Sequence, residues 1–283
     1  MNIFLTNDDG IDAEGLAVMA RAVSTWLETS PRGRGHQAII GAPHANYSGM
    51  SSAVGDIFEN ATVPYCRRVI EGAENIVTFE LTAPPALCAI IGGLGTFGWV
   101  PDIILSGINP GANVGRSVLH SGTVGAVLTG AQMGISGLAV SMQWGDHVHY
   151  ETAAHLALEV LEELLDAPIL TSFNLNVPNV PLQELRGVRR ARISLAEVVD
   201  AAGPLAGGKP LGDSGDLPLR WGAASPSIGD VSDEEADDDG ALVESGFAAL
   251  TPLQGPRENT DLALDAIVRS ALARLTSHIE SGR

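Results

Sequence analysis

The sequence predicts an α/β protein built on a doubly wound, mostly parallel sheet. Short apolar runs alternate along the chain with stretches that carry helical periodicity. This alternation is typical of right-handed β-α-β crossovers, in which helices cover both faces of one sheet. With 283 residues, 45% of them hydrophobic, the chain can bury a large core as one large domain or two small ones.

The predicted strands are apolar runs of strand length bounded by Gly, Pro, Asn and Asp. They lie at residues 2–6, 37–42, 76–82, 102–106, 137–142, 170–177, 187–195 and 246–252. The predicted helices carry apolar residues at a spacing of three and four. They lie near residues 15–28, 84–92, 122–134, 151–166 and 260–279.

Residues 203–240 interrupt this alternation. They combine Gly and Pro with an acidic run at 233–240. Such a composition buries too little apolar area to order itself, so we expect a solvated, mobile excursion here.

Composition excludes several classes of partner. The formal net charge of −18 speaks against binding to nucleic acid or to an acidic membrane surface, because both require a basic face. Cys66 and Cys88 are too few for a disulfide scaffold or a thiolate metal site. No secretory signal pattern opens the sequence and no apolar run of about 18 residues occurs, so we expect a cytoplasmic protein.

Two adjacent carboxylates follow the first predicted strand. Open parallel sheets bind ligands beyond the carboxyl ends of their strands, which is where Asp8 and Asp9 fall. Paired carboxylates there offer oxygen ligands for a hard divalent cation such as Mg²⁺. Taken alone, Asp-Asp-Gly is more simply a turn before a helix N-terminus. Partners elsewhere in the chain must decide between these interpretations.

Three further segments fall at strand ends or at turns from strand to helix: residues 41–49, 106–115 and 119–124. Ser48 and Asn109 supply neutral oxygen donors, although each could be an ordinary turn residue. Ser121, Gly122 and Thr123 begin a helix, where free N–H groups and the positive dipole end attract an anion. A cation pocket beside a phosphate-type cradle supplies the parts of metal-assisted phosphate hydrolysis.

These motifs together resemble the SurE survival proteins, a family of metal-dependent 5′-nucleotidases and phosphatases that act on nucleoside monophosphates. The matching motifs are TNDDGI at 6–11, APxxNxSG at 42–49, SGINPGANVG at 106–115, HSGTVGA at 120–126, FNLNVP at 173–178 and TPL at 251–253. Single short motifs carry a real false-positive risk, but the four N-terminal ones in this order are highly specific.

The resemblance implies hydrolysis of nucleoside 5′-monophosphates to nucleoside and phosphate. It places one divalent metal ion per subunit, Mg²⁺ or Mn²⁺, on Asp8, Asp9, Ser48 and Asn109. It places substrate contacts on Asn113, Ser121, Gly122 and Thr123. We assign catalysis to Asp8, Asp9 and Ser121, with a metal-bound or Asp-activated water displacing the alcohol. A covalent aspartyl-phosphate is less favoured, since metal-coordinating carboxylates are poorer nucleophiles.

The resemblance also implies a Rossmann-like fold whose C-terminal β-hairpin and helix are exchanged between subunits, giving a homodimer or homotetramer. We therefore expect a single SurE-like domain over 1–283, with a catalytic core at 1–185 and a divergent extension at 186–283. The extension lacks the Thr-Arg-Gln and arginine-rich pattern of the family, and Leu87 replaces a family aspartate. These departures leave nucleotide preference and assembly open.

Two histidines and a tryptophan lie near these motifs. His120 could protonate the leaving group, but a partly buried imidazole bonded to a carbonyl is the simpler expectation. His44 is most simply a surface loop residue. Trp144 follows a strand end and could stack on a base, although packing is the simplest role for a tryptophan.

Two other functions stay open at this point. Residues 93–98 spell GxGxxG, the fingerprint of nicotinamide-dependent oxidoreductases, but they follow a predicted helix rather than a strand and so resemble a helix C-cap. A non-catalytic nucleotide-binding or scaffold homologue would keep the fold and lose turnover.

Overall fold

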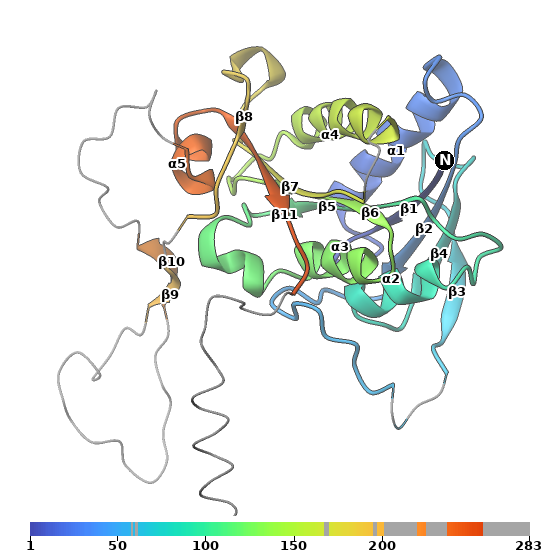
Figure 1. The fold of residues 1–283 in the computed structure, drawn as a ribbon. Coiled ribbons are helices and arrows are strands. Elements are labelled where there is room, and N and C mark those ends of the chain that lie inside the picture. Colours follow the sequence, from blue (N-terminus) through green and yellow to red (C-terminus); the bar gives the residue numbers. More distant parts are fainter. Residues whose placement is uncertain are drawn as a thin grey trace, which may run out of the picture.

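The computed structural model describes residues 1–57, 59, 62–166, 170–194, 197–200, 220–224 and 237–256. Within these ranges, one nine-stranded sheet has the order β3-β4-β2-β1-β5-β6-β7-β11-β8 (Figure 1). From β4 to β7 neighbouring strands run parallel, whereas β3 and β11 are antiparallel to β4 and β7. The predicted doubly wound, mostly parallel α/β fold is therefore confirmed.

The strands of the main sheet are β1 (Asn2–Thr6), β2 (Gln37–Pro43), β3 (Tyr65–Arg68), β4 (Val77–Leu81), β5 (Ile103–Pro110), β6 (Ser136–Met142), β7 (Ser172–Val177), β8 (Val188–Arg190) and β11 (Ala248–Leu253). A separate antiparallel pair is formed by β9 (Glu197–Asp200) and β10 (Arg220–Ala224). The helices are α1 (Glu14–Thr29), α2 (Pro85–Gly93), α3 (Gly122–Gln132), α4 (Tyr150–Leu165), α5 (Asp239–Glu244) and the 3₁₀ turns η1 (Gly115–Leu119) and η2 (Leu182–Glu184).

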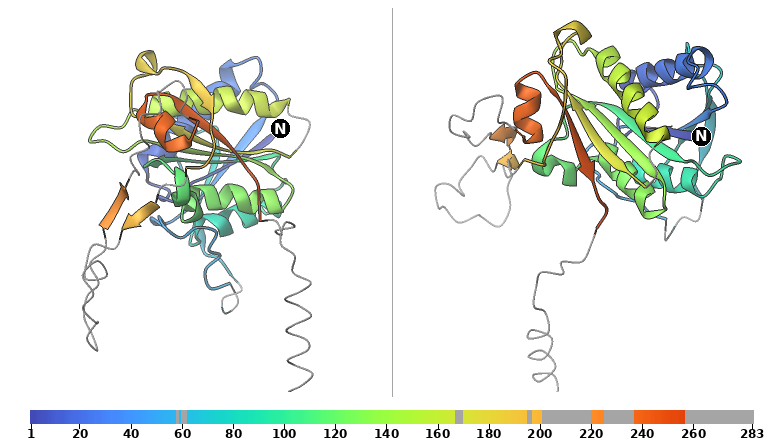
Figure 2. Two further views of the ribbon diagram at one scale, coloured as in Figure 1. Left: turned by 60° about the vertical axis from the view of Figure 1, so that its left-hand side comes forward. Right: turned by 45° about the horizontal axis from the view of Figure 1, so that its top comes forward.

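Helices cover both faces of the sheet. Alternate residues of the central strand β1 enter two cores: Ile3 and Leu5 pack with α1 and α4, and Phe4 packs with α2 and α3. Figures 1 and 2 show the same two layers of helices on opposite sides of the strands. Burial on both faces explains why Ile3, Phe4 and Leu5 of β1 form an unbroken apolar run.

The predicted elements differ from the observed ones at several places, and β9, β10 and α5 were not predicted at all. Sequence reasoning missed β3, because this exposed edge strand contains Arg67 and Arg68 instead of an apolar run. Strand β5 continues beyond residue 106 to Pro110, with a register shift between Ser106 and Asn109, so Asn109 lies within the strand. The predicted strand 187–195 shortens to β8, Val188–Arg190.

The predicted acidic excursion is only partly described. Residues 203–219 and 225–236 of the predicted excursion lie outside the described residues, as does the predicted helix 260–279, whereas residues 220–224 form β10. The expectation of a solvated run is wrong at Asp239, which is 0% exposed. Its carboxylate is buried because it accepts N–H groups from Gly115, Ser194 and Gly240 at 2.9–3.1 Å.

The two ends of the stretch between Arg192 and Asp239 are fastened to each other. The amide of Arg192 donates to the carbonyl of Asp237 and the amide of Asp239 donates to the carbonyl of Arg192, both at 2.8 Å. The Arg192 guanidinium also pairs with the Asp237 carboxylate at 2.6 Å. We refer to this junction as the neck.

Among the described residues, no helix combines the length and apolar character needed to cross a membrane.

Candidate active site

The predicted site residues meet at the carboxyl ends of β1 and β5. Thr6 at the end of β1 pairs in register with Ser106 of β5. Asp8 and Asp9 follow Thr6, and Asn109 follows Ser106. All three therefore lie on the carboxyl-terminal side of the paired residues Thr6 and Ser106 of these neighbouring parallel strands. The structure thus brings these residues to one edge of the sheet, as the rule for open α/β sheets predicts.

Asp8 is seated against the N-terminus of α3. Its side chain is 2% exposed, and the Thr123 hydroxyl donates a hydrogen bond to Oδ1. Burial raises the pKa of Asp8, while hydrogen bonds from the Thr123 side chain and from the main chain of Thr123 and Gly122 oppose this rise. Gly122 permits the contact, because a Cβ there would lie 2.7 Å from the Asp8 Cβ.

The predicted phosphate cradle is therefore partly directed at a protein carboxylate. The donors of Gly122 and Thr123 face Asp8 in this structure. Ser121 is the N-cap of α3, and its Oγ accepts the Val124 amide at 3.1 Å. A serine hydroxyl that accepts one hydrogen bond can still donate another, so the Ser121 O–H remains able to bind a ligand oxygen.

Asp9 is the less shielded member of the pair. Burial and the neighbouring Asp8 charge raise the pKa of Asp9 to about 7, against a lowering contribution from the Asn46 amide, which donates to Oδ1 at 3.3 Å. Its Oδ2 is buried and has no hydrogen-bond partner among the described residues. Adjacent carboxylates with an unpaired buried oxygen fit a divalent cation, which would relieve both the repulsion and the unpaired acceptor.

Ser48 is linked to Asp9 through Asn46. The loop that carries them is anchored by the Tyr47 amide, which donates to the Asp8 carbonyl at 2.6 Å. The Asn46 side chain accepts the Ser48 amide at 2.8 Å while its own amide reaches Asp9. Ser48 is exposed at this position. Sequence reasoning missed Asn46, although it is the Asn of the APxxNxSG motif.

Asn109 lies near the end of β5, and Asn113 follows in the turn after that strand. We refer to residues 109–115, the end of β5 and this turn, as the 109–115 loop. The Asn109 side-chain amide donates to the Gly111 carbonyl at 2.6 Å. Its Oδ1, the atom that a cation needs, accepts no hydrogen bond from the described residues. Asn113 is 9% exposed and is held by the buried side chains of Ser141, Asn174 and Asn176. These three polar residues were also missed, because they lie within predicted strands.

The described residues contain no group of three or more His, Cys, Asp or Glu side chains arranged to hold a metal. The predicted ligand set has only two such residues, Asp8 and Asp9. The remaining ligands, Ser48 and Asn109, are neutral oxygen donors, which hard cations also accept.

The two histidines and Trp144 are all exposed. His120 is exposed, so the expectation of a partly buried imidazole is wrong. Its main chain closes η1, because its amide donates to the Ser117 carbonyl at 2.9 Å and its carbonyl accepts the Ser51 amide at 3.1 Å. His44 is a surface loop residue, as expected, with its ring edge-on to Tyr47 at 5.8 Å. Trp144 is 71% exposed on the loop after β6, which is inconsistent with a packing role.

The glycine-rich segment 93–98 follows α2 and leads towards β5. A dinucleotide-binding loop instead leaves a strand and opens a helix. The helix C-cap interpretation is therefore confirmed.

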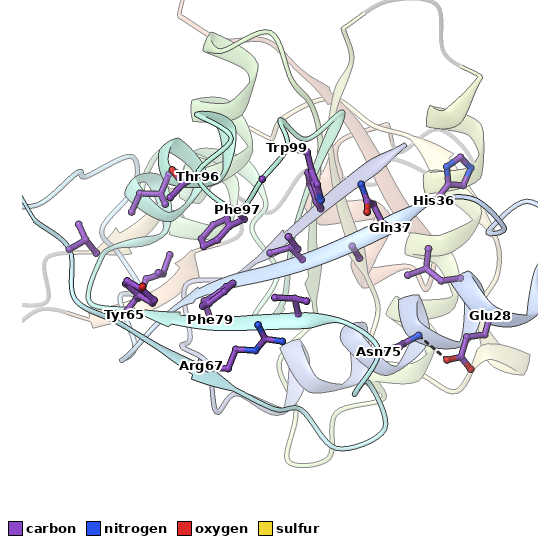
Figure 3. Close-up of a pocket in the computed structure, with 18 residues that line it drawn as sticks. Glu28, His36, Gln37, Tyr65, Arg67, Asn75, Phe79, Thr96, Phe97 and Trp99 are labelled. Carbon is purple, nitrogen blue, oxygen red and sulfur yellow. Dashed lines mark hydrogen bonds between the residues drawn. The ribbon is translucent and has the colours of Figure 1, made fainter.

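A large hollow of about 1140 Å³ lies away from these residues (Figure 3). Residues of β2, β3 and β4 border this hollow. Its lining includes the aromatic side chains of Phe79, Phe97 and Trp99 and the side chain of Arg67. None of the predicted site residues lines it. A smaller hollow of about 430 Å³ adjoins the site loop at Tyr47 and Met50 and is bordered by apolar residues such as Leu87.

Comparisons with known proteins find relatives of this chain. A family model described as survival protein SurE matches residues 3–200. A 5′/3′-nucleotidase SurE from Serratia proteamaculans is 34% identical over 256 residues, which cover 90% of each chain. The corresponding relative from Cronobacter sakazakii is 32% identical and covers 89% of this chain and 90% of its own. The crystal structure of SurE protein from Aquifex aeolicus shares the fold, with a TM-score of 0.70, 23% identity and coverage of 94% of this chain and 98% of that one.

Proposed function

This chain belongs to the survival protein SurE family, and from that premise we propose that it hydrolyses nucleoside 5′-monophosphates to nucleoside and phosphate in a divalent-metal-dependent reaction. The relatives named 5′/3′-nucleotidase SurE support a phosphoric monoester hydrolase. The observation that carries the proposal is the adjacent pair of carboxylates: Asp8 is buried beside the N-terminus of α3, and Asp9 is half-buried with its Oδ2 unpaired among the described residues.

One divalent ion per subunit, Mg²⁺ or Mn²⁺, would be held by Asp8, Asp9, Ser48 and Asn109. When bound, it supplies Lewis acidity toward an oxygen of the phosphate. Support for this donor set comes from the unpaired Asp9 Oδ2 and from the Asn109 side chain, whose amide nitrogen is occupied by Gly111 while Oδ1 is left as a ligand atom.

The protein groups divide the remaining work. Thr123 fixes the Asp8 carboxylate, so Asp8 contributes orientation and charge. Asp9 is the better proton acceptor for the attacking water, because Asp8 is held by hydrogen bonds from Thr123 and Gly122, whereas the Asp9 Oδ1 accepts the Asn46 amide at 3.3 Å and its Oδ2 is left for the cation. The Ser121 hydroxyl and the Asn113 side chain would hold the other phosphate oxygens and stabilise charge as the ester bond breaks.

The test is phosphate release from a panel of nucleoside monophosphates and sugar phosphates in Mg²⁺, Mn²⁺ or EDTA. We expect turnover of the nucleotides with metal and none in EDTA. The matched pair of variants is Asp9→Asn and Asp12→Asn. Asp12 is an exposed carboxylate that pairs with Arg68 and should tolerate the change, whereas Asp9→Asn should abolish release. Full activity in EDTA or in Asp9→Asn would contradict the proposal.

The homodimer or homotetramer implied by the resemblance is part of the same proposal. Light scattering coupled to size-exclusion chromatography measures the subunit number directly, and a monomeric mass at micromolar concentration would contradict it.

A further inference from the structure

We propose that Asn176 is a positioning residue of this site: its buried side-chain amide brackets the main chain of Asn113 and so holds the 109–115 loop against the substrate. The inference rests on the proposed function, because it concerns the residues that orient the phosphate. Asn176 lies on β7, which does not neighbour the β5 strand that leads into this loop.

The bracket consists of two opposed hydrogen bonds. The Asn113 amide donates to Asn176 Oδ1 at 2.7 Å, and Asn176 Nδ2 donates back to the Asn113 carbonyl at 3.1 Å. Asn174, two residues earlier on the same strand, donates from Nδ2 to the same carbonyl at 2.8 Å. One side-chain amide thus gives Asn113 the donor and acceptor that a neighbouring strand would give it.

The setting makes the bracket rigid. Asn174 and Asn176 are both 0% exposed, so water does not compete for their amides. Buried main-chain donors and acceptors need partners, and the loop obtains them here from side chains because β5 ends at Pro110. Fixed hydrogen bonds in a dry environment hold a site residue more tightly than the same bonds in water.

The Asn113 side chain is hydrogen-bonded to Ser141, whose hydroxyl can act as either acceptor or donor. Asn113 Nδ2 donates to Ser141 Oγ at 2.8 Å. Because a serine hydroxyl both donates and accepts, the amide can also be assigned with Oδ1 accepting from Ser141. That orientation presents Nδ2 to a phosphate oxygen. Ser141 also stands in register with Asn109 on the adjacent strand, so it lies beside both residues of the loop.

A bracket predicts coupling between the two residues. If Asn176 acts only through Asn113, Asn176→Ala and Asn113→Ala should each lower kcat/KM for a nucleoside monophosphate by about 10- to 100-fold, mainly by raising KM. The double variant should then lie within about threefold of either single variant. A residue that merely stabilises the fold would give effects that multiply.

The control is Ser172→Ala, on the same strand. Ser172 is 5% exposed and its hydroxyl has no hydrogen-bond partner among the described residues, but it lies at the opposite end of β7 from Asn176. We expect KM in this variant to match the wild type. Thermal unfolding of all variants shows which of them are folded.

Inorganic phosphate supplies a readout that does not require turnover. Calorimetric titration in the presence of Mn²⁺ should show weaker phosphate binding by Asn176→Ala, by the same factor as Asn113→Ala. If Asn176→Ala fails to fold, Ser141→Ala removes only the side-chain anchor and should weaken phosphate binding about threefold or more.

Wild-type phosphate affinity in folded Asn176→Ala, or multiplying losses in the double variant, would overturn the positioning role. Absence of phosphate release from every substrate by the wild-type chain would refute the proposed function instead, and the phosphate affinities would still decide the role of Asn176.

Discussion

Replacing Gly122 by alanine tests whether the close seat of Asp8 against α3 is needed for activity. A Cβ at this position would lie 2.7 Å from the Asp8 Cβ, and 2.9 Å from both the Asp8 Oδ2 and the Pro85 Cγ. Ordinary contacts of a Cβ begin near 3.4 Å. The added methyl group must therefore move Asp8 or the helix N-terminus by about half an ångström or more, because neighbouring atoms are close-packed.

The expected losses in stability and in activity differ in size. Overpacking costs about 1–3 kcal/mol, while replacing a helical glycine by alanine returns up to about 1 kcal/mol, so the free energy of unfolding should fall by about 0–3 kcal/mol. Displacing a catalytic carboxylate by a fraction of an ångström to one ångström can cost about 100-fold in rate. Gly122→Ala should thus remain folded and lose about two orders of magnitude in kcat/KM.

Gly130→Ala is the matched control, with the same substitution in the same helix. A Cβ there would lie 2.4 Å from the Ile104 Cδ1, the end of a flexible core side chain. We expect a comparable loss in urea-induced unfolding and unchanged kcat/KM. Wild-type activity in Gly122→Ala, or an equal loss of activity in both variants, would refute the reasoning that Asp8 depends on this contact.

Three further variants follow from the structure. In EDTA, Asp9→Asn should be more stable than the wild type by about 2–4 kcal/mol at pH 8 and by almost nothing at pH 4. The reason is that the pKa of Asp9 is about 7 in the folded state, above its ordinary value of 3.8, so the ionised Asp9 carboxylate destabilises the wild-type fold. This destabilisation of the wild type is complete above pH 7 and disappears as the pH falls toward 4. An equal gain at both pH values in urea melts would contradict this. Asp239→Ala leaves buried N–H groups without their acceptor and should lower the free energy of unfolding by about 2–4 kcal/mol, whereas a change below about 0.5 kcal/mol would mean that these contacts contribute little. Trp144→Ala should leave stability within about 0.5 kcal/mol of the wild type but raise KM for nucleoside monophosphates about three- to tenfold; an equal rise for glycerol phosphate would argue against base stacking.

The sequence predicts the position of the site because strand order and strand ends follow from local patterns. The apolar run before Asp8 and the run before Asn109 both read as buried parallel strands, and the pairing of Thr6 with Ser106 then aligns their ends. Helix α3 was also predicted, with Ser121, Gly122 and Thr123 at its start, and the structure places this start beside Asp8 with Ser121 as the N-cap.

What the sequence could not show depends on contacts between distant segments. Asn176 lies in a strand where alternation predicts one polar, solvated face, yet both Asn174 and Asn176 are buried because the 109–115 loop lies against them. Asp239 sits in an acidic run whose composition indicates solvent exposure, but the amides of Gly115 and Ser194 enclose its carboxylate. In both cases the hydrogen-bond partner is far away along the chain, so no local sequence pattern indicates that the side chain is buried.

The neck at Arg192 and Asp237 has a consequence for how this chain can vary. A stretch whose first and last residues are already tied together contributes little to the geometry of the sheet, whatever its length, because the entropy of closing a loop grows only slowly with added residues. Insertions or grafted peptides in this stretch, placed away from Ser194 and from β9, which contacts η1, should therefore leave Asp8 and its surroundings intact. This makes the stretch a suitable point for attaching a reporter, and a place where relatives can diverge at low cost to the rest of the protein.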